Sequence, residues 1–132
     1  MTFGEQACRF LTSLSFEQKL PNQVEVMNPY KTSEVQRCVK TFFDNYYNDN
    51  RKRIYVWGIN PGRHGGGVTG LPFTDPFALR HSLGIDHALS GQRELSSEFV
   101  YQVIEAFGGV NKFYAKFYIN SLSPLGFQRL SK

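Results

Sequence analysis

Two segments of the sequence place an asparagine where a predicted strand ends and a loop with proline begins. They are Gly58-Ile59-Asn60-Pro61-Gly62 and Ile119-Asn120-Ser121-Leu122-Ser123-Pro124. In an open parallel sheet, ligands bind outside the carboxyl ends of the strands. An asparagine there offers one acceptor and one amide donor, the groups needed to read the edge of a flat heterocycle such as a nucleobase. Because an amide accepts no proton near neutral pH, any catalysis by Asn60 must come from orienting a water molecule.

Longer stretches around both asparagines resemble a known family. The segment from Gly58 to Phe73 reads GINPGRHGGGVTGLPF. It resembles the first motif of single-strand-selective monofunctional uracil-DNA glycosylases, in which a Gly-x-Asn-Pro-Gly turn leads through a glycine-rich loop to Thr-Gly-x-Pro-Phe. The segment Tyr118–Leu125 resembles the second pocket segment of that family, an asparagine before a Pro-Leu pair. The resemblance covers roughly residues 54 to 127, and Arg63-His64 departs from the better-known members, which indicates a divergent, bacterial-type subgroup.

The resemblance implies a role for each residue of these motifs. Asn60 is expected to be catalytic and to hold the attacking water near C1′ of the deoxyribose, in a site shaped by the backbone of Gly62 and Arg63. Phe73 is expected to stack on the flipped base, a contact worth about 1 to 3 kcal/mol that holds a base without selecting it. Asn120 is expected to select uracil over cytosine. Its amide can pair with the O4 and N3–H edge of uracil, whereas cytosine presents the opposite arrangement of donor and acceptor there. The other substrate-site residues expected from the motif are Gly58, Ile59 and Gly70.

The implied reaction is hydrolysis of the N-glycosidic bond of uracil or a related deaminated base in DNA. The base leaves as an anion and water adds at C1′, with fixed dipoles around the base supplying much of the effect. The implied partner is uracil-containing DNA, single- or double-stranded, with no cofactor. We expect no metal, because His81 and His87 have no partner at ligand spacing.

One catalytic segment of the family has no counterpart in this sequence. The family carries a His-Pro-Ser type segment near its C-terminus, which donates to O2 of the departing base, and a wedge loop in the same region. His64, His81 and His87 all lie upstream and none is followed by proline. The resemblance therefore covers only the N-terminal part of the family's domain, and we expect weak or no glycosylase activity from these residues alone.

Other interpretations of the same residues stay open at this stage. Asn60 can be a turn residue bonded to its own loop, Phe73 a core aromatic that anchors the loop, and Asn120 a residue that satisfies backbone groups at a turn. A non-enzymatic nucleobase or single-stranded nucleic-acid binding module is the second functional hypothesis. A phosphate-binding α/β enzyme is the third, although no Gly-Lys-Ser/Thr follows the glycines as a P-loop requires.

Bulk properties favour one folded, mildly basic domain. The 132 residues are 41% hydrophobic and carry a formal charge of +4, which attracts phosphate-rich partners without identifying one. Arg51-Lys52-Arg53 is either a DNA phosphate contact or, more commonly for such runs, a solvated charge run. We expect Cys8 and Cys38 to be buried reduced thiols. No leader and no apolar run of about 18 residues is present, so we predict no secretion signal and no membrane span, and the cytosol, at the nucleoid, is the default location.

The predicted elements place both motifs at strand ends. The run from Arg53 to Ile59 is rich in branched and aromatic residues, which predicts a strand buried on both faces of a parallel sheet, and Phe117–Leu122 predicts a second. A short extended piece is predicted at 24–27 and helices at 2–14, 33–46, 76–83 and 96–107. The first is opened by a capping box at Thr2 and Glu5, the third has Asp75 as its N-cap and Pro76 as its first residue, and the fourth is ended by Gly108-Gly109.

Helices that separate buried strands predict an α/β fold. We expect a three-layer α/β/α arrangement with a central parallel sheet, uracil-DNA glycosylase-like and incomplete at the C-terminus. The sequence is taken as one truncated domain over residues 1–132, with a helical part at 1–50 and a part with the sheet and base pocket at 53–132.

Overall fold

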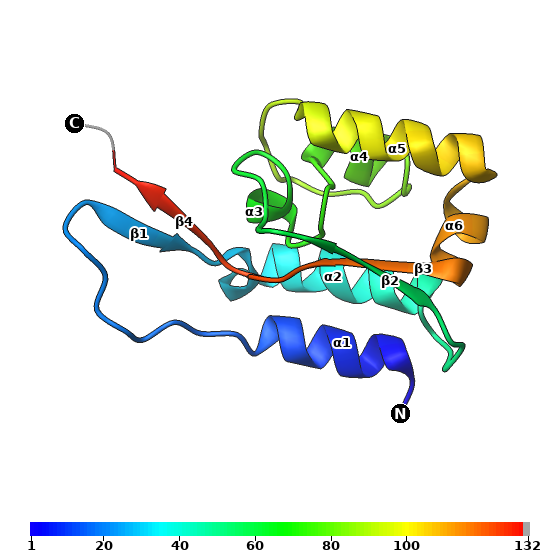
Figure 1. Cartoon of the computed structure of the whole chain (residues 1–132), viewed down its shortest axis with the longest axis horizontal. Helices are drawn as coiled ribbons and strands as arrows, with labels where there is room; N and C mark the ends of the chain where they lie inside the picture. The colour runs from blue at the N-terminus through cyan, green and yellow to red at the C-terminus, as the bar shows by residue number, and fades with distance from the viewer. Residues whose placement is uncertain (131–132) are drawn as a thin grey trace.

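The computed structural model describes residues 1–130, in which helices alternate with short strands (Figure 1). The helices are α1 (Phe3–Thr12), α2 (Ser33–Tyr46), α3 (Gly66–Thr69), α4 (Pro76–His81), α5 (Leu95–Phe107) and α6 (Val110–Lys116), with one 3₁₀ turn at Pro29–Lys31. The strands are β1 (Val24–Met27), β2 (Ile54–Gly58), β3 (Phe117–Ser121) and β4 (Gly126–Arg129).

The predicted parallel pairing is confirmed. Strand β2 pairs with β3 in parallel, with Ile54 opposite Phe117 and Gly58 opposite Ser121. The pairing continues past both strand ends, since the Leu122 amide donates to the Gly58 carbonyl at 2.9 Å. Because parallel strands end at the same edge, the two motifs become neighbours there although about sixty residues separate them in the chain.

Helices cover both faces of this strand pair, as the three-layer prediction requires. The ring of Tyr118 in β3 lies 4.8 Å from that of Phe3 in α1 and 6.4 Å from that of Phe43 in α2. Its neighbour Phe117 points to the opposite face, where its ring lies 5.3 Å from Phe107 in α5 and 4.9 Å from Phe113 in α6. Figure 1 shows α1 and α5 on opposite sides of the strands.

Local capping determines where several helices begin and end. At α1 the Glu5 amide donates to the Thr2 hydroxyl at 3.2 Å and the Thr2 amide donates to the Glu5 carboxylate at 2.7 Å, which is the predicted capping box. At α4 the Ala78 amide donates to the carboxylate of Asp75 at 2.8 Å, and Pro76 takes the first helical position as expected. Helix α5 ends at Gly108, whose φ of 128° few other residues adopt.

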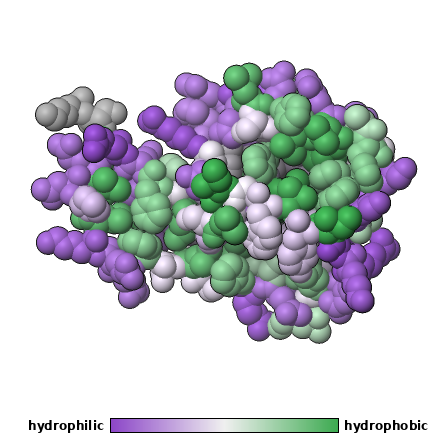
Figure 2. All heavy atoms as spheres, viewed as in Figure 1, coloured by the Kyte–Doolittle hydropathy of each residue, from purple (hydrophilic) through white to green (hydrophobic). Residues whose placement is uncertain are grey.

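The prediction that residues 53–59 form a strand buried on both faces is wrong. The side chains of β2 are 41–53% exposed, namely Ile54, Tyr55, Val56 and Trp57. Within residues 1–130 only β3 pairs with this strand, so its other edge is open and its faces are partly covered. Figure 2 shows apolar side chains gathered over β2 and over α5, where Leu95, Phe99 and Val103 are exposed. Composition predicted the strand, but burial depends on flanking strands and helices.

Two helices and one strand were not predicted. Helix α3 lies inside the expected loop, and α6 follows the predicted end of α5 directly. Strand β4 pairs antiparallel with β1, with Val24 opposite Arg129 and Met27 opposite Gly126. The extended piece at 24–27 is thus confirmed, but its partner is four residues long and too short to show an alternating pattern.

The basic residues before β2, Arg51-Lys52-Arg53, differ in their exposure to solvent. Arg51 and Lys52 are exposed, whereas the side chain of Arg53 is 1% exposed and pairs with Asp49 at 2.8 Å. The Arg53 guanidinium also lies 4.5 Å from the ring centre of Tyr47 and donates to the Tyr114 carbonyl at 2.7 Å. Arg53 therefore anchors the start of β2 in the core and is not available as a DNA phosphate contact.

The two cysteines differ in burial. Cys38 is fully buried on the core side of α2, while Cys8 is only half-buried, and neither forms a disulfide. Across the described part of the chain, no helix has both the length and the apolar character that crossing a membrane requires.

Candidate functional site

Asn60 lies at the exposed end of β2, at the start of the glycine-rich loop. Within residues 1–130 its side-chain amide forms no hydrogen bond, so the described loop does not contain the bond that a turn asparagine would make. The loop closes on the carbonyl of Gly62, which accepts from the amides of Gly65 at 3.2 Å and Gly67 at 2.8 Å. A Cβ on Gly67 would lie 2.7 Å from that same carbonyl, so the turn requires glycine there.

Phe73 returns to the same strand end from the far side of the loop. A Cβ on Gly58 would lie 2.9 Å from the ring of Phe73, so the ring rests on a strand position that must lack a side chain. Phe73 has a φ of 54°, a left-handed conformation that costs a non-glycine residue about 1–3 kcal/mol. Its buried neighbour Thr74 holds this conformation, because its carbonyl accepts from the Thr69 hydroxyl and its hydroxyl bonds that of Tyr101, both at 2.7 Å.

Asn120 is 9% exposed and already holds two partners. Its amide nitrogen donates to the Tyr118 hydroxyl at 2.8 Å, and its oxygen accepts from the Ser121 amide at 2.8 Å. Burial raises the pKa of Tyr118 to about 12, so this hydroxyl stays protonated at neutral pH. Alternation along β3 places Asn120 on the Tyr118 face, which α1 and α2 cover.

Ser121 is a residue that the sequence reasoning missed. It lies opposite Gly58 in the sheet, is 6% exposed, and its hydroxyl lies 3.8 Å from the position of a Cβ on Gly58. The Ser121 hydroxyl and the Phe73 ring therefore meet over Gly58. Within the described residues this hydroxyl forms no hydrogen bond. The signal available in the sequence was the alternation of β3, which turns Ser121 and Asn120 to opposite faces.

The remaining predicted site residues fall into two groups. Ile59 is 80% exposed and Arg63 is exposed, both on the open side of the loop. Gly70 is buried instead, with a φ of 78°, and a Cβ there would lie 2.8 Å from the ring of Tyr30. The Tyr30 hydroxyl donates to the Gly70 carbonyl at 2.7 Å, which ties the loop to the core away from Asn60. The structure thus gathers Gly58, Phe73 and Ser121, turns Asn120 to the opposite face of β3 and places Gly70 against the core.

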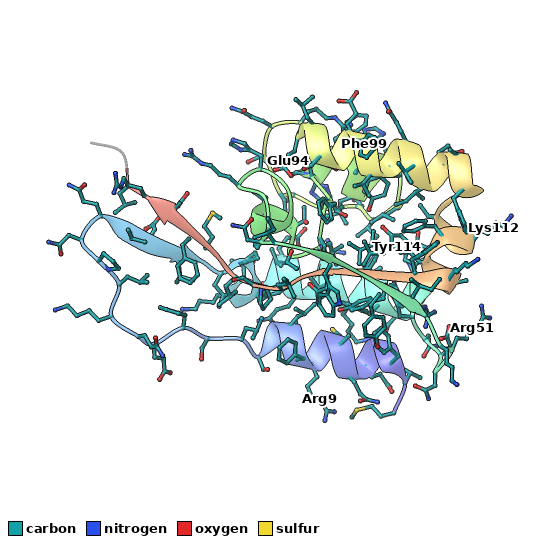
Figure 3. All side chains as sticks on the ribbon, viewed as in Figure 1. Arg9, Arg51, Glu94, Phe99, Lys112 and Tyr114 are labelled. Atoms are coloured by element: carbon teal, nitrogen blue, oxygen red, sulfur yellow. The ribbon has the colours of Figure 1, made fainter. Side chains whose placement is uncertain are left out.

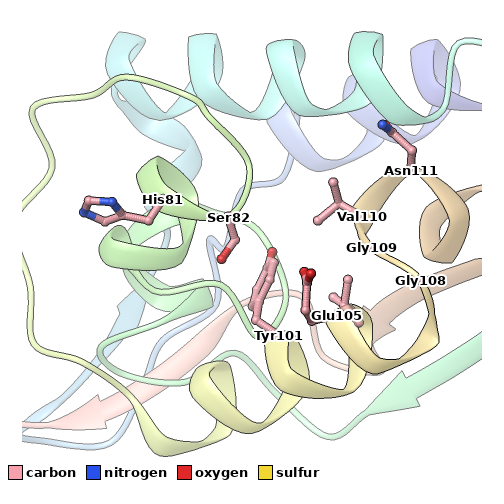
Figure 4. A pocket seen from close by; sticks show the side chains of 9 residues that line it. His81, Ser82, Tyr101, Glu105, Gly108, Gly109, Val110 and Asn111 are labelled. Carbon is pink, nitrogen blue, oxygen red and sulfur yellow. The ribbon is translucent and has the colours of Figure 1, made fainter.

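A separate hollow lies away from these residues. Figure 4 shows it between α4 and the connection from α5 to α6, with His81, Ser82, Tyr101 and Glu105 around it, and its volume is about 360 Å³. The Tyr101 hydroxyl at its edge bonds Thr74 and, at 3.1 Å, Tyr114. None of the residues predicted from the motifs lines this hollow.

The rings of His81 and His87 contact residues outside the predicted site. The ring of His87 is buried and engaged at both nitrogens, since Nδ1 accepts from the Leu89 amide at 3.0 Å and Nε2 lies 2.8 Å from the Pro76 carbonyl oxygen. The His81 ring lies 4.2 Å from the ring of Phe77. In residues 1–130, no three His, Cys, Asp or Glu side chains gather in an arrangement that could hold a metal ion.

Comparisons with known proteins identify the family. The model of the uracil DNA glycosylase superfamily matches residues 45–132, which include β2, the Asn60 loop and β3. The crystal structure of wild-type SMUG2 from Pedobacter heparinus superposes with a TM-score of 0.93 and is 43% identical in sequence. The match covers 99% of this chain and 57% of that one, so this chain spans little more than half of the SMUG2 chain. No curated protein matched significantly. On the family match and this likeness, the chain belongs to the uracil DNA glycosylase superfamily and is SMUG-like.

Proposed function

We propose that this chain carries the base pocket of a DNA glycosylase that hydrolyses the N-glycosidic bond of uracil or a related deaminated base in DNA. The observation that carries the proposal is the junction of the two motifs. The amides of Leu122 and Ser123 donate to the carbonyls of Gly58 and Ile59 at 2.9 and 3.0 Å, so the Asn60 loop and the end of β3 form one surface. The ring of Phe73 lies on that surface at Gly58.

In the proposed reaction, Asn60 positions the attacking water. Its amide lies at the open end of β2 with no partner among the described residues, so both its oxygen and its nitrogen can bind water. The amide takes no proton, and its contribution comes from holding the water near C1′ of the sugar. The ring of Phe73 offers a face on which an extruded base can stack, for about 1 to 3 kcal/mol.

Asn120 is proposed to select the base. Its bonds to Tyr118 and Ser121 use one of the two amide hydrogens and one of the two oxygen lone pairs. These two bonds also determine the orientation of the Asn120 amide, that is, which position its oxygen takes and which its nitrogen takes. One donor and one acceptor are left, the pair that the O4 and N3–H edge of uracil requires. The Ser121 hydroxyl beside Phe73 adds a further polar group at the same strand end.

A second candidate function is a nucleobase or single-stranded nucleic-acid binding module without catalysis. The observation that favours it is the state of the histidines. Both ring nitrogens of His87 are engaged, and His81 stacks on Phe77. His87 therefore has no free ring nitrogen with which to reach O2 of a departing base, and a pocket that only binds a base does not need such a donor.

The test is a cleavage assay on an oligonucleotide that contains one uracil, followed by alkali. Binding to the same oligonucleotide, and to one with thymine in place of uracil, is measured in parallel by fluorescence polarisation. Asn60→Ala is the test variant, and Asn111→Ala, an exposed residue of α6, is the matched control. The assay uses the longest available form of the protein, for which we expect strand breaks that disappear with Asn60→Ala and persist with Asn111→Ala. Uracil-selective binding without breaks would favour the binding module, and neither breaks nor selective binding would refute both.

A further inference from the structure

The carboxylate of Glu94 lies inside the glycine-rich loop. It accepts a hydrogen bond from the backbone amide of His64 at 3.2 Å. A Cβ on Gly62 would overlap both carboxylate oxygens, and a Cβ on Gly65 would lie 2.7 Å from Oε1. Figure 3 shows Glu94 where the segment that leads into α5 passes the loop beside α3. A side chain on Gly62 or Gly65 would therefore have to displace this carboxylate.

Further hydrogen bonds fix the backbone and the carboxylate of Glu94. Its backbone amide donates to the carboxylate of Asp75 at 2.9 Å, and the Ser96 hydroxyl donates to its Oε1 at 2.7 Å. Asp75 is fully buried, caps α4 and pairs with Arg93 at 3.0 Å. The Glu94 carboxylate therefore projects from a backbone that is tied to the start of α4, so little entropy is lost when it holds the loop.

We infer that Glu94 is a positioning residue for the loop that carries Asn60. Gly62 is two residues beyond Asn60, and its carbonyl accepts the two amides that close the turn. The carboxylate contacts this turn at Gly62, at Gly65 and at the His64 amide, and so sets the direction in which Asn60 leaves β2. An effect of Glu94 on catalysis rests on the function proposed for Asn60. The effect of Glu94 on the conformation of the loop does not depend on that function.

The charge of Glu94 supports positioning over contact with DNA. A carboxylate beside a DNA phosphate repels it, so a glutamate on a DNA-facing loop lowers affinity unless it serves another purpose. The nearby Glu98 is exposed, lies on the first turn of α5 and makes no side-chain hydrogen bond among the described residues. It provides a matched control with the same side chain.

The experiment is hydrogen–deuterium exchange on the loop amides of residues 60–70. For Glu94→Ala we expect exchange at His64 and its neighbours to rise about tenfold or more, as loss of a hydrogen bond to a charged group implies. The Tm should change little, and Glu98→Ala should leave the loop unchanged. Added formate should restore protection to Glu94→Ala, because it returns a carboxylate to the vacated space, whereas chloride at equal ionic strength should not.

Two further variants keep the test decisive if Glu94→Ala folds poorly. Glu94→Gln keeps the shape and one acceptor, so it should raise loop exchange less than Glu94→Ala. Gly62→Ala displaces the carboxylate without altering it, and its effect should not add to that of Glu94→Ala. Loop exchange equal to wild type in both Glu94→Gln and Gly62→Ala, or a rescue by chloride as strong as by formate, would overturn the inference.

Activity separates this inference from the proposed function. If the wild-type chain excises uracil, Glu94→Ala should lower kcat with little change in KM, because Asn60 no longer holds the water correctly. If the longest available form of the wild-type protein excises nothing, the proposed glycosylase function fails, and the exchange data still decide whether Glu94 holds the loop.

Discussion

The ring of Phe73 rests on Gly58 at the end of β2, with its Cζ atom 2.9 Å from the position that a Cβ on Gly58 would take. This contact joins the two ends of the sixteen-residue segment from Gly58 to Phe73, which carries Asn60. It also explains a glycine at the end of a strand otherwise made of large side chains, and a phenylalanine in a left-handed conformation.

Replacing Gly58 by alanine should displace the ring of Phe73. We expect the free energy of unfolding to fall by about 1 to 3 kcal/mol, the usual cost of overpacking, and uracil binding to weaken. Denaturant unfolding and polarisation with the uracil oligonucleotide measure the two effects. Gly91→Ala, at an exposed glycine outside the site, is the control. Unchanged binding in Gly58→Ala would mean that the position of the Phe73 ring does not matter for the base.

Phe73→Asn should separate stability from base binding. Asparagine tolerates a φ of 54° better than phenylalanine, so relief of backbone strain should offset part of the lost packing. Binding of the uracil oligonucleotide should weaken by about 1 to 3 kcal/mol because the stacking face is gone. Phe73→Leu, which keeps the strain, should be less stable than Phe73→Asn. If Phe73→Asn binds uracil as well as wild type does, stacking on this ring is not part of recognition.

Tyr118→Phe should remove the partner that orients Asn120. One amide hydrogen of a buried asparagine would then lack an acceptor, at a cost of about 1 to 3 kcal/mol in the free energy of unfolding. Discrimination between uracil and cytosine should also fall, because only the Ser121 amide then holds the orientation of the Asn120 amide. Competition between the two oligonucleotides measures this, and Tyr55→Phe is the control because Tyr55 is 51% exposed. Retained discrimination in Tyr118→Phe would remove Asn120 from the recognition proposal.

Buried tyrosines should make the protein sensitive to alkali. Burial raises the pKa of Tyr118 and of Tyr101 to about 12, above their ordinary value near 10. Between these values the folded state keeps protons that the unfolded state releases, so stability is fully present below pH 10 and falls as the pH rises toward 12. Denaturant unfolding across this range measures the loss, and Tyr118→Phe should make it shallower. Stability that is flat up to pH 12 would contradict the burial of both hydroxyls.

Valine truncations in β2 and α2 should report the unequal burial of these elements. Val56 is 41% exposed and Val39 is fully buried. Val39→Ala should lower the free energy of unfolding by about 1.5 to 3 kcal/mol, and Val56→Ala by less than about 1 kcal/mol. Thermal unfolding of both variants makes the comparison. Equal costs would show that β2 is covered in solution.

Local features of the sequence determined much of the fold and the family. The capping box at Thr2, the Asp75-Pro76 start of α4 and the glycine that ends α5 involve residues a few positions apart, so the sequence alone predicted them. The two asparagine motifs were recognisable for the same reason, and their place at strand ends followed from the composition of the strands.

Tertiary structure decided the relationships between distant residues. Glu94 reaches the loop from thirty residues beyond His64, β4 pairs with β1 across about a hundred residues, and the register of β3 against β2 brings Ser121 to Gly58 and Phe73. No local periodicity encodes such pairs. The exposure of β2 has the same origin, because the side chains of a strand are suited to burial by their chemistry but are buried only where other strands and helices pack against them.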